Sequence, residues 1–208
     1  MRSPHVFVLC TGRCGSTTFA RACSHFTNYT AGHETRTARL GADRFDYPRH
    51  HIEADNRLTW LLGRLDRHFG EAPLYVHLRR TPGRTIDSFA RRSTGGIMRA
   101  YRGDGILMGL EETDMSRVAA DYVDTVTTNV ELFLARKPHV MDMRLEHMQQ
   151  DFPDFCDRIS AQGDLDAALA EFSIRHNATP KRTPRRSLRA RLRRVLPRQE
   201  PAAEAWGR

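Results

Sequence analysis

The residues best suited to chemistry gather in one short segment near the start of the chain. Residues 6–9 form an apolar, β-branched run typical of a buried parallel strand, and Gly12 and Gly15 interrupt the turn after it. Glycines let the backbone wrap around an oxyanion, and the start of a following helix offers unpaired N–H groups and a favourable dipole. The segment therefore predicts an anion loop for phosphate or sulfate. Its expected ligand-binding residues are Gly12, Arg13, Cys14, Gly15, Ser16, Thr17 and Thr18.

The spacing of this anion loop (residues 12–18) differs from that of a nucleotide P-loop. A Walker-type loop has four residues between its first glycine and a Gly-Lys-Ser/Thr sequence, whereas two residues separate Gly12 from Gly15 and no lysine follows. The order Gly-Arg-x-Gly-Ser-Thr instead resembles the 5′-phosphosulfate-binding loop of sulfotransferases that use 3′-phosphoadenosine 5′-phosphosulfate (PAPS). In that family an arginine or lysine stands where Arg13 stands, and a serine is usual where this chain has Cys14.

A second strand-turn-helix pattern spans residues 74–92, with Pro82 at the turn. It resembles the 3′-phosphate-binding motif of the same family, in which an arginine at the strand end and a serine eight residues later share the phosphate. Arg80 and Ser88 have that separation. Arginine gives phosphate oxygens a planar, permanently charged partner. The resemblance therefore implies that Arg80 and Ser88 bind the 3′-phosphate of PAPS.

Residues 31–36, Ala-Gly-His-Glu-Thr-Arg, resemble the Gly-Glu-Glu-Thr-Arg stretch of tyrosylprotein sulfotransferases. This resemblance implies that Glu34 is the general base that accepts the proton of an acceptor hydroxyl. His33 is an alternative base, because the unperturbed pKa of histidine suits that role near neutral pH. Arg13 would stabilise the charge that develops on the sulfuryl and bridging oxygens during transfer.

The rest of the chain predicts alternating helices and strands. Residues 56–69 carry leucines at helical spacing before a strand at 74–78, and residues 116–135 predict a long helix before a strand near 139–143. This order predicts an α/β fold of three layers around a central parallel sheet, with ligands at the carboxyl edge of the strands. The family resemblance implies the P-loop NTPase-like sulfotransferase fold. A glycine-rich loop region near residues 95–106 could shape an acceptor pocket.

The net charge of +8 is concentrated at the C-terminal end. Residues 1–179 hold 23 basic and 23 acidic residues, whereas residues 180–208 hold 10 basic and 2 acidic ones. A chain of 208 residues is long enough for one domain with a substantial core. We therefore expect a sulfotransferase domain over residues 1–179, followed by an Arg-rich tail over residues 180–208.

Apolar residues recur at helical spacing within this basic tail, at Leu188, Leu192, Val195 and Leu196. A basic amphipathic segment of this kind could dock on the domain, contact an anionic membrane surface or contact nucleic acid. Of these three, contact with nucleic acid is the least expected. The family resemblance implies that a late basic segment, here residues 181–186, partly closes the nucleotide site. The end of the tail is expected to be solvated and disordered.

The composition gives no sign of a metal centre or a membrane span. The four cysteines lack zinc-like pairing, no signal-peptide pattern follows the first methionine, and no run of 18 apolar residues occurs. His50, His51 and Glu53 lie close together in sequence, but we expect them to be loop residues rather than metal ligands. We expect a cytoplasmic protein with free thiols. The near absence of lysine suggests a GC-rich bacterial genome.

These patterns favour an enzyme that transfers a sulfuryl group from PAPS, without a metal, to a hydroxyl acceptor. A carbohydrate, a small molecule, a lipid-like alcohol and a tyrosine all present such a hydroxyl, and the oligomeric state stays open. The alternative is a non-catalytic protein that binds a nucleotide or polyanion and attaches to membrane or nucleic acid through its basic tail. A cysteine-dependent phosphatase is excluded by spacing, because Ser16 stands where its loop needs an arginine six residues after Cys10.

Overall fold

The structure is a computed structural model that describes residues 3–174 and residue 176 of the chain. The predicted Arg-rich tail, residues 180–208, and the predicted domain end at residue 179 lie outside the described residues. None of the helices in the described part is long and apolar enough to cross a membrane.

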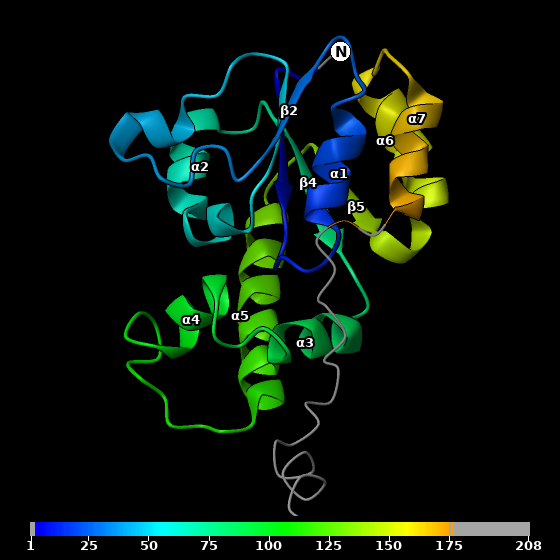
Figure 1. Ribbon diagram of the computed structural model, residues 1–208. Coiled ribbons are helices and arrows are strands. Elements are labelled where there is room, and N and C mark those ends of the chain that lie inside the picture. The colour runs from blue at the N-terminus through cyan, green and yellow to red at the C-terminus, as the bar shows by residue number, and fades with distance from the viewer. Residues whose placement is uncertain (1–2, 175, 177–208) are drawn as a thin grey trace, which may run out of the picture.

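Five parallel strands form the central sheet, in the order β2-β3-β1-β4-β5 (Figure 1). The central strand, β1, pairs with β3 on one side and with β4 on the other, and Val6 lies opposite both Ile52 and Leu74. All carboxyl ends of a parallel sheet meet at one edge, which is where ligands bind in such folds. The strands are β1 (His5–Leu9), β2 (Thr30–His33), β3 (His51–Ala54), β4 (Leu74–Arg79) and β5 (Val140–Arg144).

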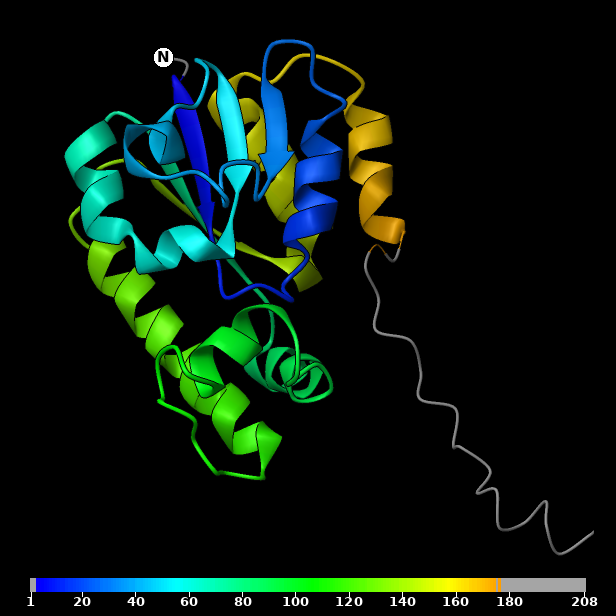
Figure 2. The ribbon, with the colours of Figure 1, turned by 60° about the vertical axis from the view of Figure 1, so that its left-hand side comes forward.

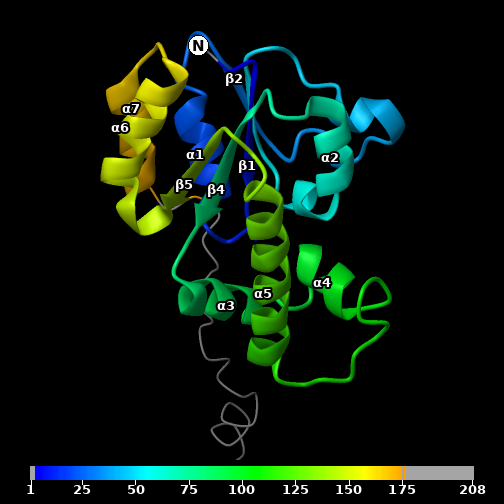
Figure 3. The same ribbon diagram turned by 180° about the vertical axis from the view of Figure 1, so that it is seen from behind.

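Helices cover both faces of the sheet, because the strand residues are apolar on both sides (Figures 2 and 3). Val6 and Val8 of β1 lie in one hydrophobic core. Phe7 and Leu9 lie in the other. The helices beside the first core are α1 (Ser16–Cys23), α6 (Met148–Ile159) and α7 (Leu165–Ala170), and those beside the second are α2 (Leu62–Phe69) and α5 (Met115–Leu134).

A smaller group of helices lies beyond the carboxyl ends of the strands (Figure 1). It consists of α3 (Pro82–Ala90), α4 (Gly96–Arg102) and the first half of α5. Helix α5 runs back along the sheet, so it ties this group to the second core.

The structure confirms the predicted α/β fold with a central parallel sheet. The helix predicted over residues 56–69 is divided into a 3-10 helix, η2 (Asn56–Trp60), and α2. The stretch near residues 95–106, expected to be a loop region, contains α4. The expectation that His51 and Glu53 are loop residues is wrong, because both belong to β3. Pairing with β1 and β2 on both sides makes this short polar segment a strand.

Candidate active site

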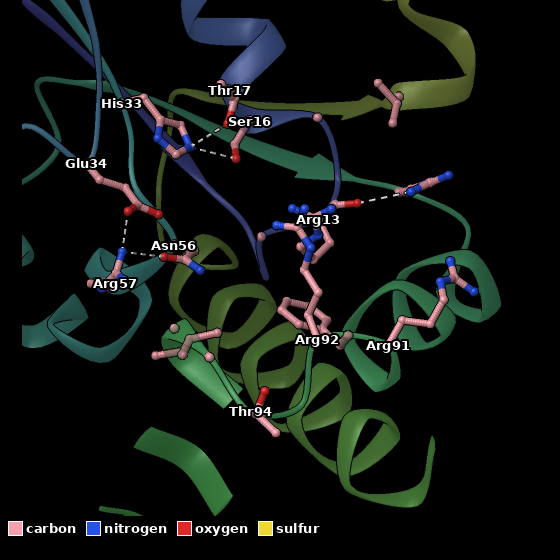
Figure 4. A pocket seen from close by; sticks show the side chains of 18 residues that line it. Arg13, Ser16, Thr17, His33, Glu34, Asn56, Arg57, Arg91, Arg92 and Thr94 are labelled. Carbon is pink, nitrogen blue, oxygen red and sulfur yellow. Dashed lines mark hydrogen bonds and ion pairs between the residues drawn. The ribbon is translucent and has the colours of Figure 1, made fainter. Parts of the chain in front are cut away.

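A pocket of about 490 Å³ lies at the carboxyl edge of the sheet (Figure 4), a volume within the usual range of small-molecule sites. It is bounded by the anion loop, the ends of β2 and β4, η2, and the segment that joins α3 to α4. The residues that line it are Gly12, Arg13, Gly15, Ser16, Thr17, His33, Glu34, Asn56, Arg57, Arg80, Phe89, Arg91, Arg92, Thr94, Gly95, Gly96, Ile97 and Leu145.

Most of the site residues predicted from sequence lie together around this pocket. The exceptions are Cys14, Thr18 and Ser88, which do not line it. All three side chains are buried, so Cys14 and Thr18 can meet a ligand only through their backbone. The anion loop therefore presents backbone groups together with the side chains of Arg13, Ser16 and Thr17.

The anion loop has an unusual backbone that only some residues can adopt. Gly12, Arg13 and Gly15 have φ angles of 83°, 58° and 93°, all in the left-handed region. A Cβ atom on Gly12 would lie 2.7 Å from Asn56 Nδ2, and one on Gly15 would lie 2.6 Å from Leu145 Cδ1. Left-handed residues before a helix turn successive N–H groups toward one point, which is how backbone nests bind anions. Strain of this kind at a non-glycine residue such as Arg13 is typical of functional sites.

The pocket lining is strongly cationic. Among the described residues it holds five arginines and one carboxylate, that of Glu34. Figure 4 shows the side chain of Arg92 extending toward Arg13. Burial, followed by repulsion from Arg92 and Arg80, lowers the pKa of Arg13 from its usual value. An anionic ligand would relieve this repulsion, so the lining favours a ligand with several negative charges.

Hydrogen bonds connect the two segments for which a phosphate role was predicted. Arg80 donates from Nη1 to the backbone oxygen of Arg13 at 3.3 Å. Arg13 donates from Nε to Ser88 Oγ at 3.0 Å. Arg80 thus lines the pocket while Ser88 lies buried beside it, in contact with Arg13 rather than Arg80. The predicted sharing of one phosphate by Arg80 and Ser88 stays a prediction.

Both candidate bases lie at the end of β2 and line the pocket. His33 Nε2 lies 3.0 Å from Ser16 Oγ and 3.4 Å from Thr17 Oγ1, so this ring contacts the anion loop. Glu34 has a φ angle of 57°, and its carboxylate forms an ion pair with Arg57 (Figure 4). The Glu34 side chain is about 30% exposed, which leaves it accessible to a ligand.

A buried polar network supports the turn that carries Glu34. Glu53 is fully buried on β3, and its carboxylate accepts hydrogen bonds from the backbone N–H and Oγ1 of Thr35, both at 2.7 Å. His51 Nε2 donates to the same carboxylate at 2.9 Å, and His51 Nδ1 lies 2.8 Å from Thr30 Oγ1. Burial opposes the ionisation of Glu53, but the hydrogen bonds from His51 and Thr35 outweigh it and lower the pKa of the carboxyl. An ionised carboxylate therefore anchors the residue next to Glu34.

Replacing Glu53 by glutamine is expected to lower the free energy of unfolding by about 1–3 kcal/mol at pH 7, since buried donors would lose a charged acceptor. Because the pKa of Glu53 is lowered in the folded protein, the contribution is fully present above the carboxyl's unfolded pKa and is lost as the pH falls from there through the lower folded pKa. Urea denaturation at pH 7 and at about pH 4 measures both effects. The matched control is Asp43→Asn, at an exposed carboxylate in the 3-10 helix η1 (Gly41–Phe45). Equal stability of the two variants at pH 7 would contradict the role given to Glu53.

Sequence analysis missed several pocket residues, notably Asn56 and Arg57 of η2. The buried Asp55 positions both residues. Its carboxylate caps η2 by accepting a hydrogen bond from the backbone N–H of Arg57 at 2.7 Å. The same carboxylate accepts a hydrogen bond from Arg44 Nη2 at 2.6 Å. The signal was present as an Asp-Asn-Arg sequence directly after residues 51–54. Polar residues directly after a parallel strand lie at the ligand-binding edge of the sheet, so this sequence indicates site residues once residues 51–54 are known to form a strand.

The described residues contain no group of three or more histidine, cysteine, aspartate or glutamate side chains arranged to hold a metal ion. All four cysteines are free and buried.

No family model matches the chain, and no curated protein matches it significantly in sequence. Among solved structures, the chain is similar to one described as the sulfotransferase domain from the curacin biosynthetic pathway. The similarity covers 87% of this chain and 82% of that one, with a TM-score of 0.61 and 19% sequence identity. At this identity the likeness concerns the fold. The chain thus has the three-layer α/β fold of a sulfotransferase domain.

Proposed function

We propose that this protein is a sulfotransferase that moves a sulfuryl group from PAPS to a hydroxyl acceptor. One observation carries the proposal: the anion loop, Arg80 and the carboxylate of Glu34 line the same pocket. A donor with a phosphosulfate at one end and a 3′-phosphate at the other needs two anion sites and a nearby base. The sulfotransferase-like fold supports the same proposal.

The two anion sites would hold the donor by its two charged ends. Backbone N–H groups of residues 14–18, at the start of α1, would bind the 5′-phosphosulfate together with the hydroxyls of Ser16 and Thr17. Arg80, which lines the pocket next to Arg13, would bind the 3′-phosphate as a charged hydrogen-bond partner. This arrangement would leave the sulfuryl group between Arg13 and the end of β2, where both candidate bases lie.

When bound, PAPS supplies the sulfuryl group, and adenosine 3′,5′-bisphosphate remains after transfer. Glu34 would accept the acceptor's hydroxyl proton while the acceptor oxygen forms its bond to sulfur and the bond from sulfur to the bridging phosphate oxygen breaks. The electron pair of the broken bond stays on that oxygen, where Arg13 would stabilise the charge. His33 is the alternative proton acceptor. As in phosphoryl transfer, positioning and charge stabilisation would provide most of the catalysis.

A non-catalytic nucleotide-binding protein is the second candidate, and one observation favours it. The carboxylate of Glu34 is engaged by Arg57. A base that stays in this ion pair after the donor binds could not accept a proton.

The test is a screen of hydroxyl acceptors with isotope-labelled PAPS, read by mass spectrometry for the mass of one added sulfate. Carbohydrates, small alcohols and phenols, lipid-like alcohols and tyrosine peptides form the panel, because each class presents a suitable hydroxyl. The proposal expects at least one class to gain sulfate with the wild-type protein and far less with Glu34→Gln. Tight binding of adenosine 3′,5′-bisphosphate with no transfer to any class would favour the second candidate.

Arg80→Ala is expected to weaken binding of adenosine 3′,5′-bisphosphate roughly ten- to a hundredfold while leaving AMP binding nearly unchanged. The loss corresponds to about 1.5–3 kcal/mol for one charge-assisted contact with the 3′-phosphate. Calorimetric titration of both nucleotides measures the difference. Arg84→Ala is the matched control, because Arg84 is exposed on α3 and does not line the pocket. An equal loss for both nucleotides in Arg80→Ala would place Arg80 elsewhere than on the 3′-phosphate.

A further inference from the structure

A second hollow, of about 660 Å³, lies between the loop after α4 and the first half of α5. Its floor is apolar and includes Leu107, Leu110 and Val118. Its charged lining residues are Asp121, Asp124, Glu112 and Arg117. Asp121 accepts a hydrogen bond from Tyr101, and Glu112 is paired with Arg117. We call this hollow the α5 groove. It does not share a lining residue with the donor pocket, so it is a separate feature of the described molecule.

The surroundings of the α5 groove combine exposed apolar side chains with negative charge. Ile106 and Met108, in the loop beside it, are 52% and 82% exposed, and Leu110 in its lining is 39% exposed. Residues 103–124 hold six carboxylates and one arginine, in a chain whose net charge is +8. Asp124 has no hydrogen-bond or ion-pair partner among the described residues. Clustered exposed apolar residues with a polar rim indicate a docking surface.

The chemistry of the α5 groove predicts an occupant that is apolar on one side and strongly basic on the other. Residues 188–196 of this chain, Leu-Arg-Ala-Arg-Leu-Arg-Arg-Val-Leu, have that pattern. Leu188, Leu192 and Val195 recur at helical spacing, and arginines fill most other positions. We propose that the α5 groove binds residues 188–196 of its own chain, the apolar residues on its floor and the arginines beside its carboxylates.

The chain between the described domain and this segment is long enough. The twelve residues from His176 to Leu188 can span about 40 Å when extended, and a domain of this size has a radius of gyration of about 16 Å. Connection through a short linker also gives the segment a high effective concentration at the groove, of the order of millimolar. An anionic membrane would instead be repelled by the carboxylates of residues 103–124, although it would attract the segment itself.

The docking in the α5 groove does not depend on the proposed function.

Cross-linking in the full chain tests the docking without any donor. Because the native cysteines are buried, a short bismaleimide should join only the introduced thiols of Asp124→Cys and Arg191→Cys. The matched control places one thiol at Asp154→Cys, which is exposed on α6, a helix that packs against α7 and does not line the α5 groove. Docking predicts about tenfold more intramolecular cross-link at position 124 than at position 154, read by mass spectrometry of the joined peptides.

Further variants make the outcome decisive. Leu192→Asp, in a segment outside the described domain, should reduce the cross-link to position 124 at least severalfold, and so should Leu110→Asp in the exposed loop. Equal yields at positions 124 and 154 would overturn the proposal. It would also be overturned by a cross-link that joins two chains and grows with protein concentration, which would indicate a second copy as the partner. Loss of the cross-link only when anionic vesicles are added would still support docking in their absence.

Discussion

Glu34→Gln is expected to lower turnover roughly 100-fold or more while leaving the affinity for adenosine 3′,5′-bisphosphate nearly unchanged. Glutamine preserves the size of the side chain and an oxygen that can accept from Arg57, but it cannot accept the proton of the acceptor hydroxyl. The change therefore removes basicity from the pocket with little effect on its shape. Steady-state turnover with the acceptor found in the screen, together with calorimetric titration of the nucleotide, gives the two quantities.

His33→Gln is the companion variant, because His33 is the other candidate base at the end of β2. If Glu34 is the base, this variant should keep most of the turnover, apart from a moderate loss through the contacts with Ser16 and Thr17. Wild-type-like turnover in Glu34→Gln and a hundredfold loss in His33→Gln would move the role to His33. A large loss of nucleotide affinity in Glu34→Gln would instead show that the side chain maintains the pocket.

Arg13→Ala is expected to lower kcat/KM by roughly 100- to 1000-fold, the usual effect of removing one group that stabilises transition-state charge. Unlike Glu34→Gln, it should also weaken nucleotide binding, because the same guanidinium faces the bound phosphosulfate and the oxygen that leaves. Arg13 is also surrounded by Arg80 and Arg92, so some repulsion is relieved when it is removed. Kinetics and calorimetry on one preparation separate the effects on binding and on turnover.

Arg13→Lys is the matched control, since it keeps the positive charge and loses the Nε donor that contacts Ser88. Charge stabilisation predicts that this variant recovers most of the lost activity. If alanine and lysine are equally impaired, the contact with Ser88 matters more than the charge. Unchanged nucleotide affinity in Arg13→Ala would contradict the placement of the phosphosulfate at the anion loop.

The fold could be predicted where the secondary structure that the local sequence favours is also the one that the tertiary structure requires. The apolar run of β1, the glycines at positions 12 and 15, and the helix that follows all have strong local signals. The helix predicted over residues 116–135 likewise agrees with α5 to within one residue at each end, and the periodic leucines of residues 56–69 predicted where α2 ends. Because the carboxyl edge of a parallel sheet is a shared location, the predicted residues on different segments were also expected to meet there.

The parts that could not be predicted depend on contacts between distant segments. Strand β3 is short and alternates polar with apolar residues, so its local sequence fits a loop or a half-exposed strand. Its polar residues can be buried because His51, Glu53 and Thr35 satisfy one another's hydrogen bonds, while β1 and β2 pair with the strand on its two sides. The position of Arg57 follows from that strand and from the buried Asp55, which no local pattern reveals.

The measurement that tests the central claim most directly is calorimetric titration of the full chain with adenosine 3′,5′-bisphosphate, AMP and ATP under the same conditions. If the site has separate partners for a 5′- and a 3′-phosphate, the bisphosphate should bind at least tenfold more tightly than either AMP or ATP. In Arg80→Ala this difference in affinity should disappear. Equal affinity for the bisphosphate and AMP, or a preference for ATP, would contradict the account of this pocket as a PAPS site.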